Sequence, residues 1–190
     1  MPRSSDKTVA AILDASFLLF FRRGYARVSM NDIAAAAGVT KRTLYYHYPS
    51  KDALVGAALD KQNQLSLAAF QKWAAPEAAS TDDFVVHLFD QLAKWSMTPS
   101  WTGSGFTRLS MELGDLPGHP ARKASQRHKR ALQHWLSEEL SNRGHEGSNE
   151  AAAKIVVALE GATTLSFIHS DPEYFVIAAE IARHAVSPRA

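Results

Sequence analysis

Residues 29–48 read SMNDIAAAAGVTKRTLYYHY, a stretch that predicts two short helices in succession. Ser29 stands just before a run of apolar residues, and Asp32 follows it three residues later. A hydroxyl and an acid at this spacing are typical of a capping box, in which each side chain accepts a hydrogen bond from the other residue's backbone N–H. We therefore expect a first short helix over residues 30–37.

A tight turn separates this helix from the next one. Gly38 has no Cβ and can adopt the positive φ with which many helices end. Thr40 is a second candidate N-cap, and Pro49 cannot continue a helix. We expect the second helix over residues 41–48, and the pair then forms a helix-turn-helix.

The beginning of the second helix has the side chains that a DNA-reading helix needs. In a helix-turn-helix, the second helix enters the major groove with its N-terminal residues toward the base edges. Lys41, Arg42 and Thr43 occupy those positions, and all three donate hydrogen bonds. Leu44 is the apolar position that faces the preceding helix, and polar rings follow at residues 45–48. Such a density of polar aromatic residues is unusual for a bare surface.

The remaining sequence predicts further helices and almost no strand. Apolar residues recur at helical spacing, and good helix formers dominate. Ser148 or Asn149 is the expected N-cap of the eighth helix, and Asp171, followed by Pro172, is that of the last. The fold class is all-α with about nine helices, of which the others are expected at residues 7–23, 51–75, 82–97, 106–113, 120–142, 148–169 and 172–186.

The composition excludes several classes of protein. There are no cysteines, which removes disulfides, thiolate nucleophiles and cysteine-bound zinc. The sequence MPRSSDKT at the N-terminus lacks the apolar stretch of a signal peptide. We find no run that approaches the roughly 18–20 apolar residues of a membrane span. A cytoplasmic protein without a membrane association is therefore expected.

The charges are unevenly distributed. The net charge of the chain is only +2, but residues 1–52 hold eight Lys and Arg against four acids. A basic end joined to a slightly acidic body suits a polyanion bound by the first part, although an excess of this size also fits an ordinary solvated surface. The charge pattern thus separates residues 1–52 from residues 53–190.

Residues 7–54 resemble the N-terminal domain of the tetracycline-repressor (TetR) family. The resemblance rests on the segment ILDASFLLFFRRGYARVSMNDIA, the turn AAGVTKRTLYYHY, the capping Ser50, and the pattern Lys51-x-x-Leu54. Tyr48 stands where Phe is more frequent in the family. This stretch is about a quarter of the chain, and the rest agrees with the family only in the number and length of its helices.

The resemblance implies a homodimeric transcriptional regulator. Such a protein, most often a repressor, binds a palindromic operator in double-stranded DNA through a domain at residues 1–52. A small-molecule effector binds in a ligand-binding and dimerisation domain at residues 53–190, and the protein then releases the DNA. Within that scheme, Arg42 is suited to a bidentate contact with guanine and Tyr46 to a thymine methyl group. The resemblance places six residues at positions that meet DNA, namely Lys41, Arg42, Thr43, Tyr45, Tyr46 and His47. From their chemistry, Tyr45, His47, Lys51 and the cap residues Ser29 and Thr40 suit phosphates, and Asn31 is expected to reach a base at the edge of the site.

The body of the chain carries two further expectations. Residues of about 149–186 would form the dimer interface, since family members pair through their last two helices; these apolar faces could also fill the monomer core. The middle helices are rich in aromatic residues, which more often form a core than line a cavity. The resemblance implies a small-molecule pocket between these helices, and among their aromatic residues we expect Trp95, Trp101, Phe106 and Trp135 to line it. Effector binding would shift the helix that begins near Lys51.

Catalytic and metal sites are not expected. His119, His128 and His134 lie near one another in sequence, but no two are spaced i, i+4 on one helical face. The sequence has no HExxH, GxSxG or phosphate-loop pattern. We expect a protein that is not an enzyme and has no cofactor. A helical carrier without a DNA role and an enzyme with an unrecognised site are the two alternatives.

Overall fold

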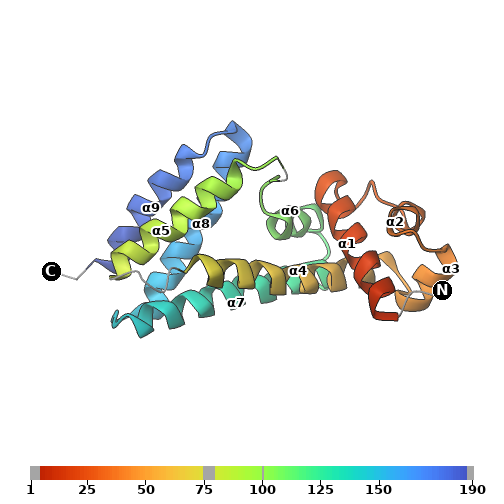
Figure 1. The fold of residues 1–190 in the computed structure, drawn as a ribbon, viewed down its shortest axis with the longest axis horizontal. Coiled ribbons are helices and arrows are strands. Elements are labelled where there is room, and N and C mark those ends of the chain that lie inside the picture. The colour runs from red at the N-terminus through yellow and green to blue at the C-terminus, as the bar shows by residue number, and fades with distance from the viewer. Residues whose placement is uncertain (1–4, 75–79, 100, 188–190) are drawn as a thin grey trace. The chain divides into compact units, whose positions relative to one another are not determined.

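The structure is a computed structural model that describes residues 5–74, 80–99 and 101–187. These residues form nine α-helices and no strand, which confirms the all-α prediction (Figure 1). Most helices begin and end within about two residues of the predicted positions; residue 75, the predicted end of one of them, lies outside the described residues. The helices are α1 (Ser5–Arg23), α2 (Met30–Ala37), α3 (Lys41–His47), α4 (Lys51–Trp73), α5 (Thr81–Ser96), α6 (Gly105–Glu112), α7 (Pro120–Asn142), α8 (Ser148–His169) and α9 (Glu173–Val186).

The predicted caps of α2 and α3 are present. The Ser29 hydroxyl accepts a hydrogen bond from the Asp32 N–H at 3.2 Å, and the Asp32 carboxylate accepts one from the Ser29 N–H at 2.8 Å. Gly38 ends α2 with φ at 63°. The Thr40 hydroxyl accepts a hydrogen bond from the Thr43 N–H at 3.1 Å. Local chemistry therefore fixes the turn between these two helices.

The predicted cap of α8 is wrong. The N-cap is Gly147, which has φ at 74° and makes no side-chain capping bond. The hydroxyl of Ser148 instead makes a hydrogen bond with that of Ser137 at 3.2 Å, and the Asn149 amide oxygen accepts one from Gln133 at 3.4 Å. Both side chains join α8 to α7 and do not cap the helix.

The start of α9 also lies one residue later than predicted. Glu173 is its first residue and Pro172 its N-cap, where Asp171 had been expected to cap. The Asp171 carboxylate nevertheless accepts a hydrogen bond from the Glu173 N–H at 2.9 Å, so it does bind a free amide of the first turn.

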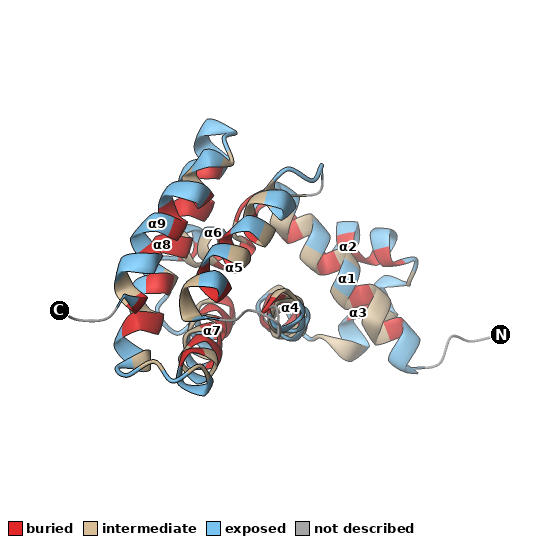
Figure 2. Ribbon diagram, turned by 60° about the vertical axis from the view of Figure 1, so that its left-hand side comes forward, coloured by how far each residue is buried: buried red, intermediate tan, exposed pale blue. Residues whose placement is uncertain are grey.

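The described residues belong to two compact units, which we treat separately. Unit 1 comprises residues 1–65 and 105–128, and unit 2 comprises residues 66–104 and 129–190. In unit 1, α1 packs against α2 and α6, and α2 against α3. Ile12, Ile33 and Leu44 are fully buried in its core. Figure 2 colours the buried residues of each helix red.

Unit 2 is built around α5, α8 and α9, which contact one another. Its core contains the fully buried rings of Phe84, Phe89 and Phe175. Several of its aromatic rings also form a continuous row, in which neighbouring centroids lie between 5.7 and 6.4 Å apart. The row runs through Trp135, Phe70, Trp73, Trp95, Trp101 and Phe167.

Helix α8 departs from the prediction that no segment is apolar enough for a membrane. By length and composition it could cross one, with a mean hydropathy of 1.5 in an 18-residue window that is 39% buried. The prediction was wrong because α8 has apolar residues on two faces. Ile155 and Leu159 are buried in the core, whereas Val157 and Ile168 are exposed. A core helix of a soluble protein has the same composition, so this is weak evidence for a membrane.

Candidate nucleic-acid interface

Helix α3 presents its polar side chains to solvent. Leu44 is fully buried and anchors the helix. Lys41 and Arg42 are exposed, and neither makes a hydrogen bond or ion pair in the part of the chain that the structure describes. Tyr46 is 84% exposed and Tyr45 is 42% exposed, large values for aromatic side chains. The structure therefore exposes two cations and two polar rings on one short helix, with the Lys41 ammonium 5.9 Å from the centroid of the Tyr45 ring.

The ends of α2 and α3 lie beside these side chains in the sequence. Asn31 is exposed in the first turn of α2. The Thr43 and Thr40 hydroxyls lie 2.8 Å apart, so Thr43 is partly engaged with its own cap. His47 is half-buried, and its ring contacts that of Tyr46 at 5.1 Å. Free backbone N–H groups at such helix starts favour anions.

Lys51 occupies a different environment from the other predicted DNA-binding residues. Its ammonium group donates hydrogen bonds to the backbone carbonyls of Tyr25 at 3.0 Å and Val28 at 3.1 Å. It also lies 4.0 Å from the centroid of the Tyr25 ring, a cation–π contact. Lys51 is thus a partner of the turn between α1 and α2.

Sequence reasoning missed a cluster of polar residues around that turn. The Glu112 carboxylate accepts hydrogen bonds from the N–H groups of Tyr25 and Ala26, both at 2.8 Å. The Tyr25 hydroxyl donates a short hydrogen bond to Asp52. The buried His119 lies with Nε2 3.4 Å from Asp52, and its Nδ1 accepts a hydrogen bond from the Ala121 N–H. Local patterns give no signal for these contacts, because Glu112 lies 87 residues from Tyr25.

The cluster shifts the pKa values of its members. Burial raises the pKa of Tyr25, and the Asp52 carboxylate that its hydroxyl binds raises it further. The same hydrogen bond lowers the pKa of Asp52. In the α2 cap, the Ser29 hydroxyl and backbone N–H lower the pKa of Asp32. Asp52 and Asp32 are therefore ionised at neutral pH.

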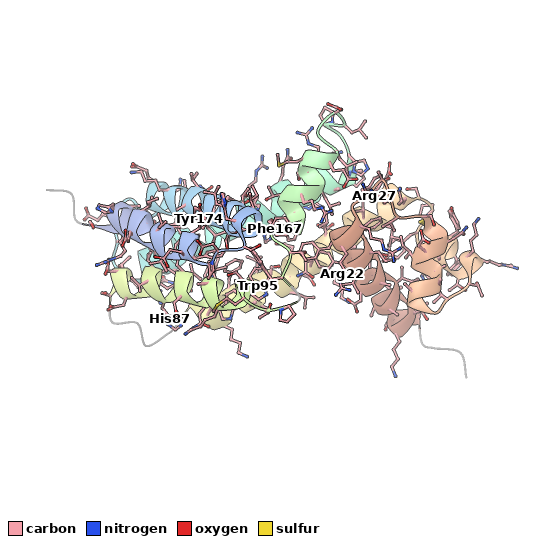
Figure 3. All side chains as sticks on the ribbon, turned by 90° about the horizontal axis from the view of Figure 1, so that it is seen from above. Arg22, Arg27, His87, Trp95, Phe167 and Tyr174 are labelled. Carbon is pink, nitrogen blue, oxygen red and sulfur yellow. The ribbon has the colours of Figure 1, made fainter. Side chains whose placement is uncertain are left out.

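The four predicted effector-binding residues do not all belong to the same unit. Trp95 and Trp101 are neighbours in unit 2, with centroids 6.4 Å apart. Trp95 and Phe167, labelled in Figure 3, both contact the Trp101 ring. Trp135 lies at the other end of the aromatic row. Phe106 belongs to unit 1, where it is buried and stacks on His128 with centroids 3.8 Å apart. It therefore belongs to the core of unit 1, whereas the three tryptophans belong to unit 2.

A groove lies on α8 and α9 within unit 2. Its volume is about 650 Å³, and apolar side chains form most of its lining. Val157 and Gly161 of α8 and Ile177 and Ile181 of α9 belong to it. Val157 is 74% exposed and Ile181 is 57% exposed. No group of three or more His, Asp or Glu that could hold a metal ion occurs among the described residues.

Comparison with known proteins agrees with this arrangement. Residues 12–58 match the model of the family described as bacterial regulatory proteins, tetR family. The HTH-type transcriptional repressor Rv3405c of Mycobacterium tuberculosis is 45% identical over 60 residues, which are 32% of each chain. The A-factor receptor protein of Streptomyces griseus is 31% identical over 115 residues, 60% of this chain and 39% of that one. The matched segments span only about a third of the length of these relatives.

The fold of a solved structure extends the similarity over nearly the whole chain. The TetR-family transcriptional regulator SCO4454 of Streptomyces coelicolor superposes with a TM-score of 0.78. The match covers 96% of this chain and 97% of that one at 24% sequence identity. Residues 12–58 therefore carry the N-terminal domain of the tetR family of bacterial regulatory proteins, and the chain as a whole shares the fold of a solved TetR-family regulator.

Proposed function

We propose that the chain is a homodimeric repressor that binds a palindromic operator in double-stranded DNA and is released by a small molecule. The observation that carries this proposal is the free polar surface of α3, with Lys41, Arg42 and Tyr46 exposed beside two capped helix starts. One similar protein is named a transcriptional repressor. The family consists of regulatory proteins, which agrees with the prediction that the chain is not an enzyme. We place its action in the cytoplasm, where DNA is accessible.

Arg42 is proposed to read a base and its neighbours to hold the DNA backbone. Its planar guanidinium can donate two parallel hydrogen bonds to guanine, which is worth about 1–3 kcal/mol of discrimination. Tyr46 is proposed to contact a thymine methyl group. The remaining predicted residues of this surface are proposed to contact phosphates or base edges. They are Ser29, Asn31, Thr40, Lys41, Thr43, Tyr45 and His47.

The groove on α8 and α9 is proposed to hold the same helices of a second copy. Exposed aliphatic side chains such as Val157 and Ile181 line it, and a partner helix would remove them from water. Gly161 has no atom within 4 Å of the position where a Cβ would stand, which leaves room for close helix approach. A two-fold pair would present two α3 helices to two half-sites.

The effector is proposed to bind in unit 2 at the aromatic row that includes Trp95, Trp101 and Trp135. The indole N–H groups of Trp101 and Trp135 are buried without a hydrogen-bond partner in the described residues, so each can donate to a ligand oxygen. One similar protein is named a receptor. Helix α4 runs from Lys51 to Trp73 and supplies residues to both units, which makes it a route for the signal.

The test of DNA binding is selection of duplexes from a random pool, followed by titration of the recovered sequence. We expect a palindromic sequence, and Arg42→Ala should lower its affinity about 5- to 150-fold at moderate salt. Arg22→Ala is the matched control, because Arg22 is an exposed arginine at the end of α1 (Figure 3). Recovery of no preferred sequence, or equal losses for the two variants, would rule out the proposed role of α3.

The dimer is tested separately by sedimentation. Ile181→Glu places a charge in the groove and should shift the protein to a monomer. Val86→Glu is the control, since Val86 is exposed on α5 outside the groove. A dimer that survives Ile181→Glu unchanged would place the interface elsewhere.

A further inference from the structure

The turn between α1 and α2 is held from two sides by charged side chains. Lys51, the first residue of α4, binds the carbonyls of Tyr25 and Val28 at 3.0 and 3.1 Å. Glu112, the last residue of α6, binds the N–H groups of Tyr25 and Ala26 at 2.8 Å each. Two side chains from distant parts of the sequence thus satisfy four backbone groups of one short segment.

This segment determines where α2 begins. Val28, whose carbonyl Lys51 binds, directly precedes Ser29, the N-cap of α2. Gly24 opens the segment with φ at 82°, and a Cβ there would lie only 2.9 Å from the Glu112 carboxylate. A side chain at residue 24 would therefore displace the Glu112 carboxylate from its present position, and the positive φ itself favours glycine there. A shift of either charged side chain would move the start of α2.

The geometry leaves Lys51 poorly placed for DNA. An ammonium group has three N–H donors, and two of them are used by carbonyls while the Tyr25 ring covers the group at 4.0 Å. A phosphate contact would compete with these bonds. Lys41, in contrast, is exposed and makes no hydrogen bond or ion pair among the described residues.

We propose that Lys51 and Glu112 are positioning residues that form a joint at the α1–α2 turn, and that Lys51 is not a phosphate ligand. The joint sets the position of α2 and, through the Gly38 turn, of α3. It gives α6, as well as α4, control over the recognition helix. The inference rests on the proposed function, because it assumes that α3 binds DNA.

Glu112→Gln tests the joint, because the joint and simple electrostatic attraction predict opposite changes in DNA affinity. Removal of a negative charge from a DNA-binding unit strengthens binding if electrostatic attraction alone matters. Glu112→Gln also loses one acceptor for the two N–H groups and so loosens the joint. We expect the affinity for the selected duplex to fall about tenfold, on the scale of hydrogen bonds to charged groups. Asp115→Asn, at an exposed acid without a contact to the turn, is the control and should not weaken binding.

Lysine variants separate positioning from phosphate contact through their salt dependence. Lys41→Met should reduce the slope of log affinity against log salt by about 0.9, as expected for one lost phosphate contact. Lys51→Met should lower the affinity at every salt concentration and change this slope by less than half as much. Lys51→Arg should not restore binding, because the planar guanidinium cannot replace an ammonium between two carbonyls and a ring. A full loss of slope in Lys51→Met with rescue by arginine overturns the proposal.

Amide hydrogen exchange without DNA distinguishes failure of the joint from failure of the proposed function. The Ile33 N–H is hydrogen-bonded to the Ser29 carbonyl at 3.2 Å and reports on the first turn of α2. We expect faster exchange at Ile33 in Lys51→Met and Glu112→Gln, with melting curves confirming that both are folded. Unchanged exchange in both variants overturns the joint, whether or not DNA is bound. Wild-type protein that selects no duplex removes only the proposed DNA role.

Discussion

Both compact units have an apolar core, but the contacts that stand out beside that core differ between them. In unit 1, polar side chains bind particular backbone groups, as Glu112 and Lys51 do at the α1–α2 turn and Ser29 does at α2. In unit 2, a row of aromatic rings and a large apolar cluster that includes the fully buried Phe84 fill the interior. All four tryptophans belong to unit 2.

This difference agrees with the proposed role of unit 1 in DNA binding. A surface that matches base edges must place its atoms accurately, and hydrogen bonds to backbone groups supply direction as well as energy. Apolar packing gives larger stabilisation but tolerates rearrangement when volume is conserved. We therefore expect substitutions in unit 2 to cost mainly stability, and those at the polar contacts of unit 1 to change geometry at a smaller cost.

The largest effect is expected from Phe84→Ala in unit 2. Phe84 is fully buried, contacts Trp135 edge-on and lies 4.4 Å below the Arg143 guanidinium. Its truncation should cost about 3–5 kcal/mol of unfolding free energy. Urea unfolding followed by tryptophan emission measures this directly in unit 2. A loss below about 1 kcal/mol would show that the core closes around the gap.

A smaller effect is expected where unit 1 depends on a glycine. Gly24→Ala forces an alanine to a positive φ and pushes its Cβ against Glu112. Gly38→Ala forces the same kind of φ, but no atom lies within 4 Å of its Cβ. We expect losses of about 2 kcal/mol and about 1 kcal/mol respectively from thermal unfolding. Equal losses of stability in the two variants would mean that the Glu112 side chain moves away from the new Cβ at no cost.

Removal of the α2 cap should cost less than a core residue. Ser29→Ala leaves the Asp32 N–H without its acceptor and should destabilise the protein by about 1 kcal/mol. Ser29→Asn, which can also cap a helix, is the matched control and should retain most of the stability. A cost as large as that of Phe84→Ala would contradict the distinction between the two units.

The smallest effect is expected from acid. The folded-state pKa values of Asp32 and Asp52 are lowered from 3.8 by their hydrogen bonds, so their contributions are present above about pH 3.8 and are lost as the pH falls through the folded values. Unfolding at a series of pH values should show this decline. It should be weaker in Asp32→Asn, and a decline that is unchanged there would show that other carboxylates cause it.

The sequence predicted those parts of the fold that depend on near neighbours. The box between Ser29 and Asp32, the turn at Gly38 and the cap at Thr40 each involve residues a few positions apart, and their chemistry is legible in a short window. The exposed polar face of α3 followed from the same pattern. Ser148 and Asn149 could not be assigned this way, because their side chains bind residues of α7.

The contacts that the sequence did not predict join distant segments. No short pattern indicates that Glu112 meets Tyr25, or that His119 approaches Asp52. An aromatic residue at helical spacing likewise does not reveal which core it enters, and nothing in the sequence indicates that Phe106 belongs to unit 1 and the three predicted tryptophans to unit 2. Nor does the sequence indicate that Lys51 binds two backbone carbonyls, because these belong to a turn more than twenty residues earlier.

The apolar groove on α8 and α9 has a consequence for how much protein the cell must make. If copies pair there before they bind DNA, the concentration of the active form rises with the square of the concentration of free chains at low abundance, by mass action. Operator occupancy would then respond steeply to synthesis rate. Pairing through exposed side chains such as Val157 would thus let the amount of protein control operator occupancy, in addition to any effector.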